Sequence, residues 1–167
     1  MMINSEMLEQ LNTTEEQLIK HLDEDVREIF SSMVGVVVPQ SQITDTTTQF
    51  KEYITGMIGF AGSYNGMISV NTPNKIAIKI ASQMLGMEVT EVDSDVQDAL
   101  GEIANMIGGS FKHHFVSGGH EVRLSTPSTI SGNEYVITVS SAPDSLTLLF
   151  TFEDDQFMVN LYLENGN

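Results

Sequence analysis

Two residues of this sequence stand out as capable of chemistry, an acid and an amide three positions apart, Glu102 and Asn105. Residues three apart on a helix lie side by side on its surface, so the two side chains would form one polar pair. The carboxylate of Glu102 can bind a lysine or an arginine, whereas the amide of Asn105 offers donors and an acceptor and does not titrate near neutral pH. Such an amide cannot act as a general base, but it can orient an attacking water molecule.

The helix that would carry this pair is predicted over about residues 94 to 116. Asp93-Ser94-Asp95 is typical of the start of a helix, and Gly118-Gly119 is typical of its end. With about 100° of rotation per residue, the apolar residues of this helix form one narrow stripe that should face the core. The stripe consists of Val96, Leu100, Ile103, Ile107 and Phe111.

The face opposite this stripe is made of small and polar residues. It carries Asp98, Glu102, Asn105 and Gly109, and it is flanked by Gly101 and Gly108. A glycine inside a helix costs about 0.5–1 kcal/mol relative to alanine, so three of them indicate a compensating gain. Because glycine carries no side chain, another backbone or another molecule can come close to this helix, and we expect Asp98 and the three glycines to contact a partner. The alternative is that this acid and this amide only contact solvent, as such residues usually do on an outer helix face.

The rest of the chain predicts an α+β fold, in which a largely antiparallel sheet is covered on one face by long helices. Further helices are expected over about 14–33 and 73–85, capped by Thr14 and Thr72, with a short frayed helical lead-in over 1–12. Strands are expected over about 35–39, 50–61, 67–71, 135–140, 146–152 and 157–163, with an irregular or edge-like segment over 40–49 and a hairpin turn at Asn65-Gly66.

Composition narrows the classes of function. Seven Lys and Arg against 23 Asp and Glu give a net charge of −16, so binding to nucleic acid or to an anionic membrane through a basic face is disfavoured. The absence of cysteine excludes disulfides, thiolate catalysis and cysteine-based metal sites. The 167 residues fit one domain, 1–167, and without a signal-peptide pattern or a long apolar run we expect a cytoplasmic protein.

Three other patterns have simpler explanations than a second site. Three histidines, at positions 113, 114 and 120, do not have the spacing of helical metal ligands, and we expect no metal site. An acidic run over 88–102, in a stretch without Lys or Arg, is a solvated cluster by default, although it could steer a basic partner. The methionines, such as Met33 and Met84, occupy core-like helical positions, so packing is the better explanation for them.

The segment 95–109, DVQDALGEIANMIGG, resembles the signature helix of the CheX branch of the CheC/CheX/FliY family. The family pattern is Glu-x-x-Asn within Gly-Glu-hydrophobic-x-Asn-Met-hydrophobic-x-Gly, and this chain matches it fully. Residues 66–70 and 81–90 are similar to the family as well. A faint echo of the motif lies over 28–35, where Ser31 stands in place of the second asparagine, so only one site is carried over from the family.

Members of this family are phosphatases of the chemotaxis response regulator CheY. The resemblance implies that Asn105 orients water and that Glu102 pairs with the active-site lysine of a phosphorylated CheY-like receiver domain. It also implies that the receiver supplies Mg²⁺, so the chain needs no cofactor of its own, and that the protein forms a homodimer through its sheet. The alternative function is a non-catalytic receiver-binding or dimerisation module, against which the intact Asn105 argues.

Overall fold

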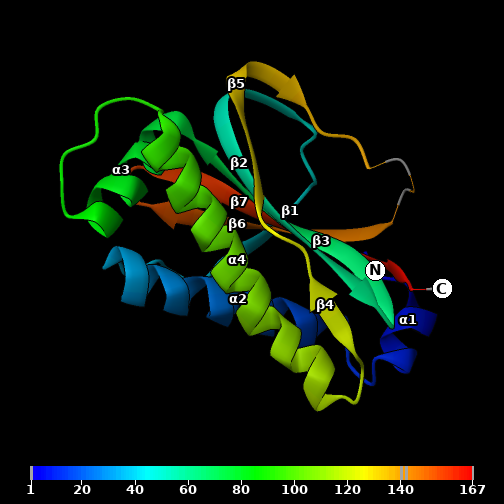
Figure 1. Ribbon diagram of the computed structural model, residues 1–167. Coiled ribbons are helices and arrows are strands. Elements are labelled where there is room, and N and C mark those ends of the chain that lie inside the picture. The colour runs from blue at the N-terminus through cyan, green and yellow to red at the C-terminus, as the bar shows by residue number, and fades with distance from the viewer. Residues whose placement is uncertain (1, 140, 142, 167) are drawn as a thin grey trace.

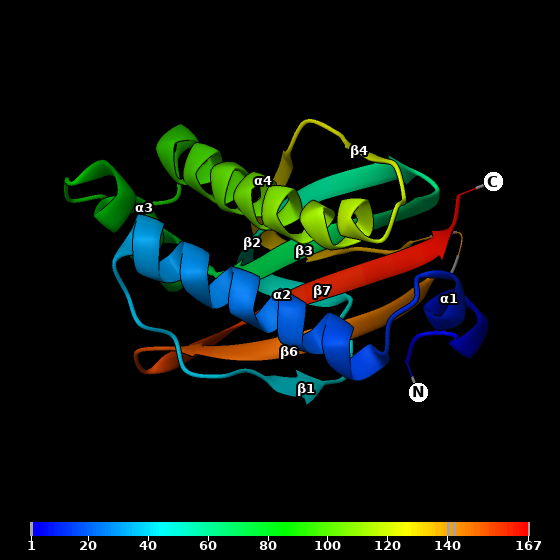
Figure 2. The ribbon, with the colours of Figure 1, turned by 90° about the horizontal axis from the view of Figure 1, so that it is seen from below.

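The computed structural model describes residues 2–139, 141 and 143–166 as one mixed sheet-and-helix structure. Three long helices cover one face of a twisted antiparallel sheet, and a short N-terminal helix packs near one end (Figures 1 and 2). The helical elements are α1 (Ser5–Gln10), α2 (Glu15–Ile29), η1 (Phe30–Val34), α3 (Asn74–Leu85) and α4 (Ser94–Ser117). The strands are β1 (Gln42–Thr44), β2 (Gln49–Gly62), β3 (Tyr64–Pro73), β4 (Val122–Leu124), β5 (Ser128–Val136), β6 (Asp144–Phe152) and β7 (Asp155–Asn165).

The sheet has seven strands in the order β1-β6-β7-β3-β2-β4, and β5 pairs with β2 next to β4. Every pairing is antiparallel. Alternate residues of the central strands, such as Ile58, Ile68 and Leu161, lie in register and are buried beneath the helices. The α+β fold class and the placement of the helices on one face are therefore confirmed.

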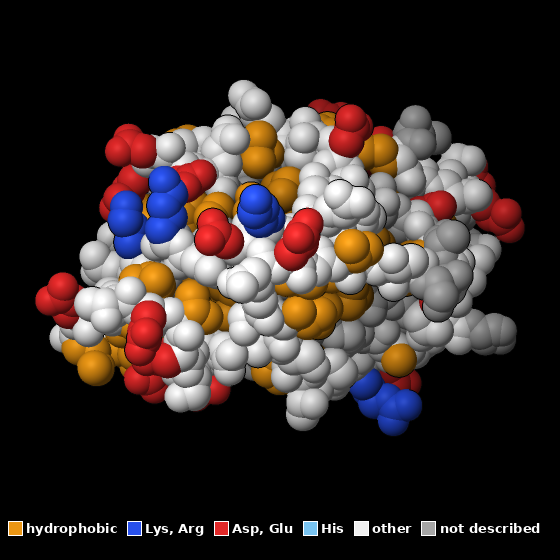
Figure 3. Space-filling view, turned by 90° about the horizontal axis from the view of Figure 1, so that it is seen from above, with side chains coloured by type: hydrophobic (Ala, Val, Ile, Leu, Met, Phe, Trp, Pro, Cys, Tyr) orange, Lys and Arg blue, Asp and Glu red, His pale blue; other side chains and the backbone are white. Residues whose placement is uncertain are grey.

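The opposite face of the sheet carries a layer of polar side chains that are also buried. Thr55 donates a hydrogen bond to Asn71 Oδ1 at 2.8 Å, and Thr46 is hydrogen-bonded to Thr147 at 2.8 Å. The connections on either side of β1 and β5 meet over this face, where Ile137 N–H donates to the Thr48 carbonyl at 2.9 Å. Hydrophobic side chains form a central band on the surface seen from above (Figure 3).

The helix expected over 14–33 is confirmed at its start, where Gln17 N–H donates to Thr14 Oγ1 at 3.1 Å. Its last residues form a π-helix, η1, which ends at Gly35 with a φ of 76°. The wider π turn changes which residues face the core, so Met33 is 40% exposed and its expected core role is wrong.

The strand expected over 35–39 is also wrong. Gly35 adopts the left-handed conformation, and the described residues 35–41 pair with no other strand. Pro39 lacks the N–H that a sheet ladder requires. Val38 is buried, but Val37 is 86% exposed, so this segment crosses the edge of the structure as an irregular connection.

The hairpin between β2 and β3 is confirmed, but its turn is not at Asn65-Gly66. The chain reverses around Ser63, with Gly62 at a φ of 145°, and Asn65 Oδ1 accepts a hydrogen bond from Gly62 N–H at 3.3 Å. Gly66 lies inside β3, where an added Cβ would clash with the backbone carbonyl oxygen of Tyr162 in β7 and would lie 2.6 Å from Cζ of Phe60. The glycine serves packing rather than the turn.

Three further expectations need correction. Thr72 does not cap α3, because its hydroxyl donates to the Ile54 carbonyl within the sheet at 3.3 Å. The strand expected over 135–140 is β5, which ends at Val136, and residue 140 lies outside the described residues. The lead-in expected to fray is an ordered helix, since Met7 and Leu8 of α1 are buried in the core.

Candidate functional site

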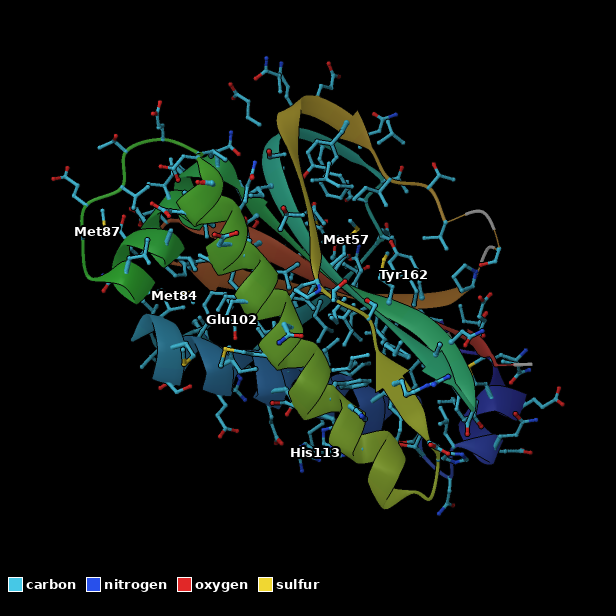
Figure 4. The ribbon with its side chains drawn as sticks, viewed as in Figure 1. Met57, Met84, Met87, Glu102, His113 and Tyr162 are labelled. Carbon is cyan, nitrogen blue, oxygen red and sulfur yellow. The ribbon has the colours of Figure 1, made fainter. Side chains whose placement is uncertain are left out.

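The helix α4 places the acid and the amide on the side of the molecule turned away from the sheet. All five stripe residues are between 0% and 1% exposed, which fixes the rotation of the helix. Glu102 and Asp98 are consequently exposed, whereas Asn105 and Gly109 are half-buried on the outer face. Figure 4 shows Glu102 on this outer side of α4.

Neither catalytic candidate is engaged by its own chain. Within the described residues, the side chains of Glu102 and Asn105 make no hydrogen bond and no ion pair. The neighbouring turn is anchored instead by Gln97, whose Nε2 donates to Ser131 Oγ of β5 at 3.1 Å. The face therefore presents a carboxylate and an amide, three residues apart on a rigid helix, to whatever binds there.

Glycines let α4 lie very close to the sheet beneath it. A Cβ added to Gly56 of β2 would lie 2.5 Å from the Leu100 carbonyl oxygen, so the helix backbone almost touches the strand. A Cβ on Gly108 would lie 2.7 Å from Ile58 Cγ2, again on the sheet side. Gly101 is buried, and a Cβ there would lie 3.6 Å from Thr129 Cγ2.

The four expected partner-contacting residues therefore divide into two pairs. Side chains of the chain's own β5 and β2 pack against Gly101 and Gly108, so packing explains why these two positions are glycine. A Cβ on Gly109 would meet no atom within 4 Å, and Asp98 is exposed. Only Asp98 and Gly109 of the four lie open beside Glu102 and Asn105.

The acidic run gives the N-terminal half of this face a negative charge. Its carboxylates are exposed, and Asp93 caps the helix by accepting hydrogen bonds from Asp95 N–H at 3.0 Å and Val96 N–H at 3.2 Å. Next to the run, Met84 and Met87 lie at the end of α3 (Figure 4), and Met87 is 56% exposed. Met84 is partly buried and packs against the core, as expected from its helical position, whereas the exposed Met87 was not singled out in the sequence.

A separate cluster of titratable groups joins α2 to the C-terminal part of α4. The rings of His21 and His114 stack with 3.8 Å between their centroids, and His114 Nε2 lies 3.1 Å from Asp25 Oδ2. Burial raises the pKa of the Asp25 carboxyl from 3.8 to about 6, and burial lowers the pKa of both imidazoles. In the part of the chain that the structure describes, no three His, Asp or Glu side chains are grouped as metal ligands.

This cluster predicts a pH-dependent stability gain for Asp25→Asn. A carboxyl with a raised pKa stabilises the folded state only while it is protonated, so wild-type stability falls as pH rises from about 4 to 6. The neutral amide removes this cost and still accepts a hydrogen bond from His114. We expect the variant to be about 1–2 kcal/mol more stable than wild type at pH 8, with no difference at pH 4. Urea unfolding at both pH values measures this, with Glu16→Gln, at an exposed acid of the same helix, as control. Equal stability at pH 8 would contradict the prediction.

Comparisons with known proteins agree with this fold and with this helix. None of the helices in the described ranges is long and apolar enough to cross a membrane. The family described as "Chemotaxis phosphatase CheX" matches residues 54–151, which include α3 and all of α4. The CheY-P phosphatase CheX of Thermotoga maritima is 25% identical over 138 residues, which cover 81% of this chain and 80% of that protein.

Solved structures show the same architecture. The chemotaxis protein CheX from Desulfovibrio desulfuricans superposes with a TM-score of 0.77 and 26% identity, over 89% of this chain and 99% of that one. CheX in the CheX–CheY–BeF3–Mg²⁺ complex from Borrelia burgdorferi gives a TM-score of 0.72 at 19% identity, over 89% and 98% of the two chains. The second likeness shows the fold alone. Because the family match spans more than half of the sequence, the chain belongs to the chemotaxis phosphatase CheX family.

Proposed function

We propose that this protein accelerates the hydrolysis of the phosphoaspartate on a CheY-like response regulator. The observation that carries the proposal is the pair Glu102 and Asn105, both unengaged by the chain, on the outer face of α4 in a member of this family. The relative named CheY-P phosphatase and the CheX–CheY complex support the choice of substrate.

In the proposed reaction Asn105 reaches the phosphoryl group of the receiver. Its amide holds a water molecule in line with the bond to be broken, which removes the entropic cost of finding that geometry. The water oxygen bonds to phosphorus as the P–O bond to the aspartyl carboxylate breaks, so inorganic phosphate leaves and the aspartate is restored. The Mg²⁺ that stabilises the phosphoryl oxygens belongs to the receiver, and this chain needs no metal of its own.

In the same proposal Glu102 docks the partner. Its exposed carboxylate pairs with the lysine beside the receiver's phosphorylation site, and Asp98 and Gly109 provide contact surface around that pair. The open space at Gly109 allows the receiver's backbone to come close to α4. Both partners act in the cytoplasm.

The proposal includes a homodimer formed through the sheet face opposite the helices. A hollow of about 430 Å³ on that face is lined by apolar side chains that include Met57, Met67, Tyr162, Ile137 and Val139. Met57 of β2 and Tyr162 of β7, both labelled in Figure 4, line this hollow from either side of β3. Light scattering is expected to give the mass of a dimer at micromolar concentration, and the mass of a monomer would contradict this part.

The experiment that tests the function mixes the protein with a phosphorylated, Mg²⁺-loaded receiver domain and follows phosphate release. We expect release to be faster than the receiver's own rate and proportional to the concentration of this protein. Binding without acceleration would instead support the alternative function, a receiver-binding or dimerisation module.

The docking role of Glu102 predicts that Glu102→Gln raises the KM for the phosphorylated receiver about five- to thirtyfold, as expected for a lost ion pair worth about 1–2 kcal/mol. The amide keeps the size of the side chain and removes only its charge. Glu91→Gln is the matched control, because Glu91 is an exposed acid of the same run outside α4. An unchanged KM for Glu102→Gln would argue against the ion pair.

A further inference from the structure

The seven cations of this chain divide into those that form an ion pair and those that do not. Three of the seven form ion pairs with acids of the chain, at 2.6–2.9 Å: Arg27 with Asp23, Lys75 with Asp155 and Lys79 with Glu153. Four have no such partner among the described residues: Lys20, Lys51, Lys112 and Arg123. In a protein of net charge −16, a surface hollow lined by two such cations is a distinct feature.

Lys112 and Arg123 are brought together by the fold. The chain reverses after α4 at Gly119, with a φ of 86°, and β4 runs back alongside the last turns of the helix (Figure 1). Lys112 of α4 and Arg123 of β4 consequently line the same surface hollow of about 350 Å³. Glu121 also lines it, so the ionised side chains of this hollow sum to 2 − 1 = +1.

This cationic hollow lies on the same side of α4 as the catalytic candidates. Lys112 follows Asn105 by seven residues, which places it within about 20° of Asn105 around the helix and about 10 Å further along it. Glu102 and Lys112 are ten residues apart, or about 15 Å, a spacing that one protein interface of standard size covers easily. The outer face of α4 is therefore negative at its N-terminal half and positive at its C-terminal end.

We propose that Lys112 and Arg123 form a second docking point, which binds an acidic side chain on the surface of the receiver domain and sets its orientation over Asn105. The inference rests on the proposed function, because the partner is the same receiver. A single ion pair at Glu102 leaves the receiver free to rotate about that contact. A second contact of opposite sign removes this freedom and disfavours a reversed orientation, in which like charges would meet.

The test replaces the two cations one at a time and together, as Lys112→Gln and Arg123→Gln. We expect the KM for the phosphorylated receiver to rise about two- to fivefold for each and about tenfold for both, as for exposed ion pairs. The kcat at saturating receiver is expected to fall modestly, because part of the bound receiver is then misoriented. The difference in KM is expected to shrink in ~0.5 M salt. Lys51→Gln is the matched control, because Lys51 is an exposed, unpaired lysine on β2, opposite Glu134 of β5.

An unchanged KM in the double variant would overturn the inference, and so would an equal rise in Lys51→Gln, which would show an effect of net charge alone. Thermal unfolding identifies a purely structural role. If a cation only stabilised the C-terminus of α4, its replacement would lower Tm and leave KM unaltered. The proposed function has its own test, since a wild-type protein that does not accelerate phosphate release would contradict that function without deciding the docking inference. In that event, calorimetric binding of the same variants to the phosphorylated receiver decides the inference by itself: weaker binding supports it and equal binding overturns it.

Discussion

Asn105→Ala is expected to lower the accelerated rate of phosphate release at least about 100-fold, while binding to the phosphorylated receiver stays measurable. The alanine removes the amide that is proposed to orient water, but it leaves the carboxylate of Glu102 and the rest of the α4 face intact. Since Asn105 makes no hydrogen bond within the described chain, its loss leaves no buried group unpaired and the fold is expected to be unaffected.

Two measurements are needed for this variant. Phosphate release at saturating receiver gives the effect on kcat, and titration with the phosphorylated receiver gives the affinity. Gln83→Ala is a matched control, because Gln83 is an exposed amide on α3, outside the candidate site. Full activity in Asn105→Ala would contradict the water-orienting role. A loss of binding with unchanged kcat would show that Asn105 acts in docking instead.

Gly56→Ala is expected to destabilise the protein by about 1–3 kcal/mol and to lower its activity, although Gly56 lies beneath the candidate site rather than in it. The added methyl would lie 2.5 Å from the Leu100 carbonyl oxygen, so α4 or β2 must move. Because α4 carries both Glu102 and Asn105, a displacement of the helix also displaces these two candidate residues relative to the proposed partner. Urea unfolding measures the stability, and phosphate release measures the consequence for the site.

The control for Gly56→Ala is Gly109→Ala, which adds the same methyl group on the outer face of α4. No atom of the chain lies within 4 Å of the position of the added Cβ, so in the free protein only the helix propensity changes, and this variant is a control for stability alone. We expect this variant to be more stable than wild type by about 0.5–1 kcal/mol. Gly56→Ala with wild-type stability and activity would show that α4 does not depend on this close contact with the sheet.

The helix that carries the candidate site, and the side of that helix on which its polar pair lies, could both be predicted from the sequence. The period of Val96, Leu100 and Ile103 is a local property of the chain, and burial of that stripe leaves the opposite side in solvent. The pair Glu102 and Asn105 follows from the same period. The α+β class was equally predictable, since the apolar faces of long amphipathic helices and of alternating strands must be buried against each other.

Local signals failed where one residue type can serve two purposes. Asn65-Gly66 is a typical tight-turn sequence, but position 66 must be glycine because the Tyr162 carbonyl and the ring of Phe60 leave no room there for a side chain. Thr72 is a residue type typical of helix caps, but its hydroxyl donates a hydrogen bond to the Ile54 carbonyl inside the sheet. In each case the deciding neighbour is distant in sequence, and no local pattern contains it.

The tertiary structure alone decided what surrounds the site. It assigned Gly101 and Gly108 to packing against the chain's own strands and left Gly109 open, a distinction that depends on which side of α4 the sheet lies. It also placed Arg123 of β4 and Lys112 of α4 in the lining of one hollow. Helix periodicity is encoded over a few neighbouring residues, whereas these contacts arise only when strands and helices from separate parts of the chain pack together.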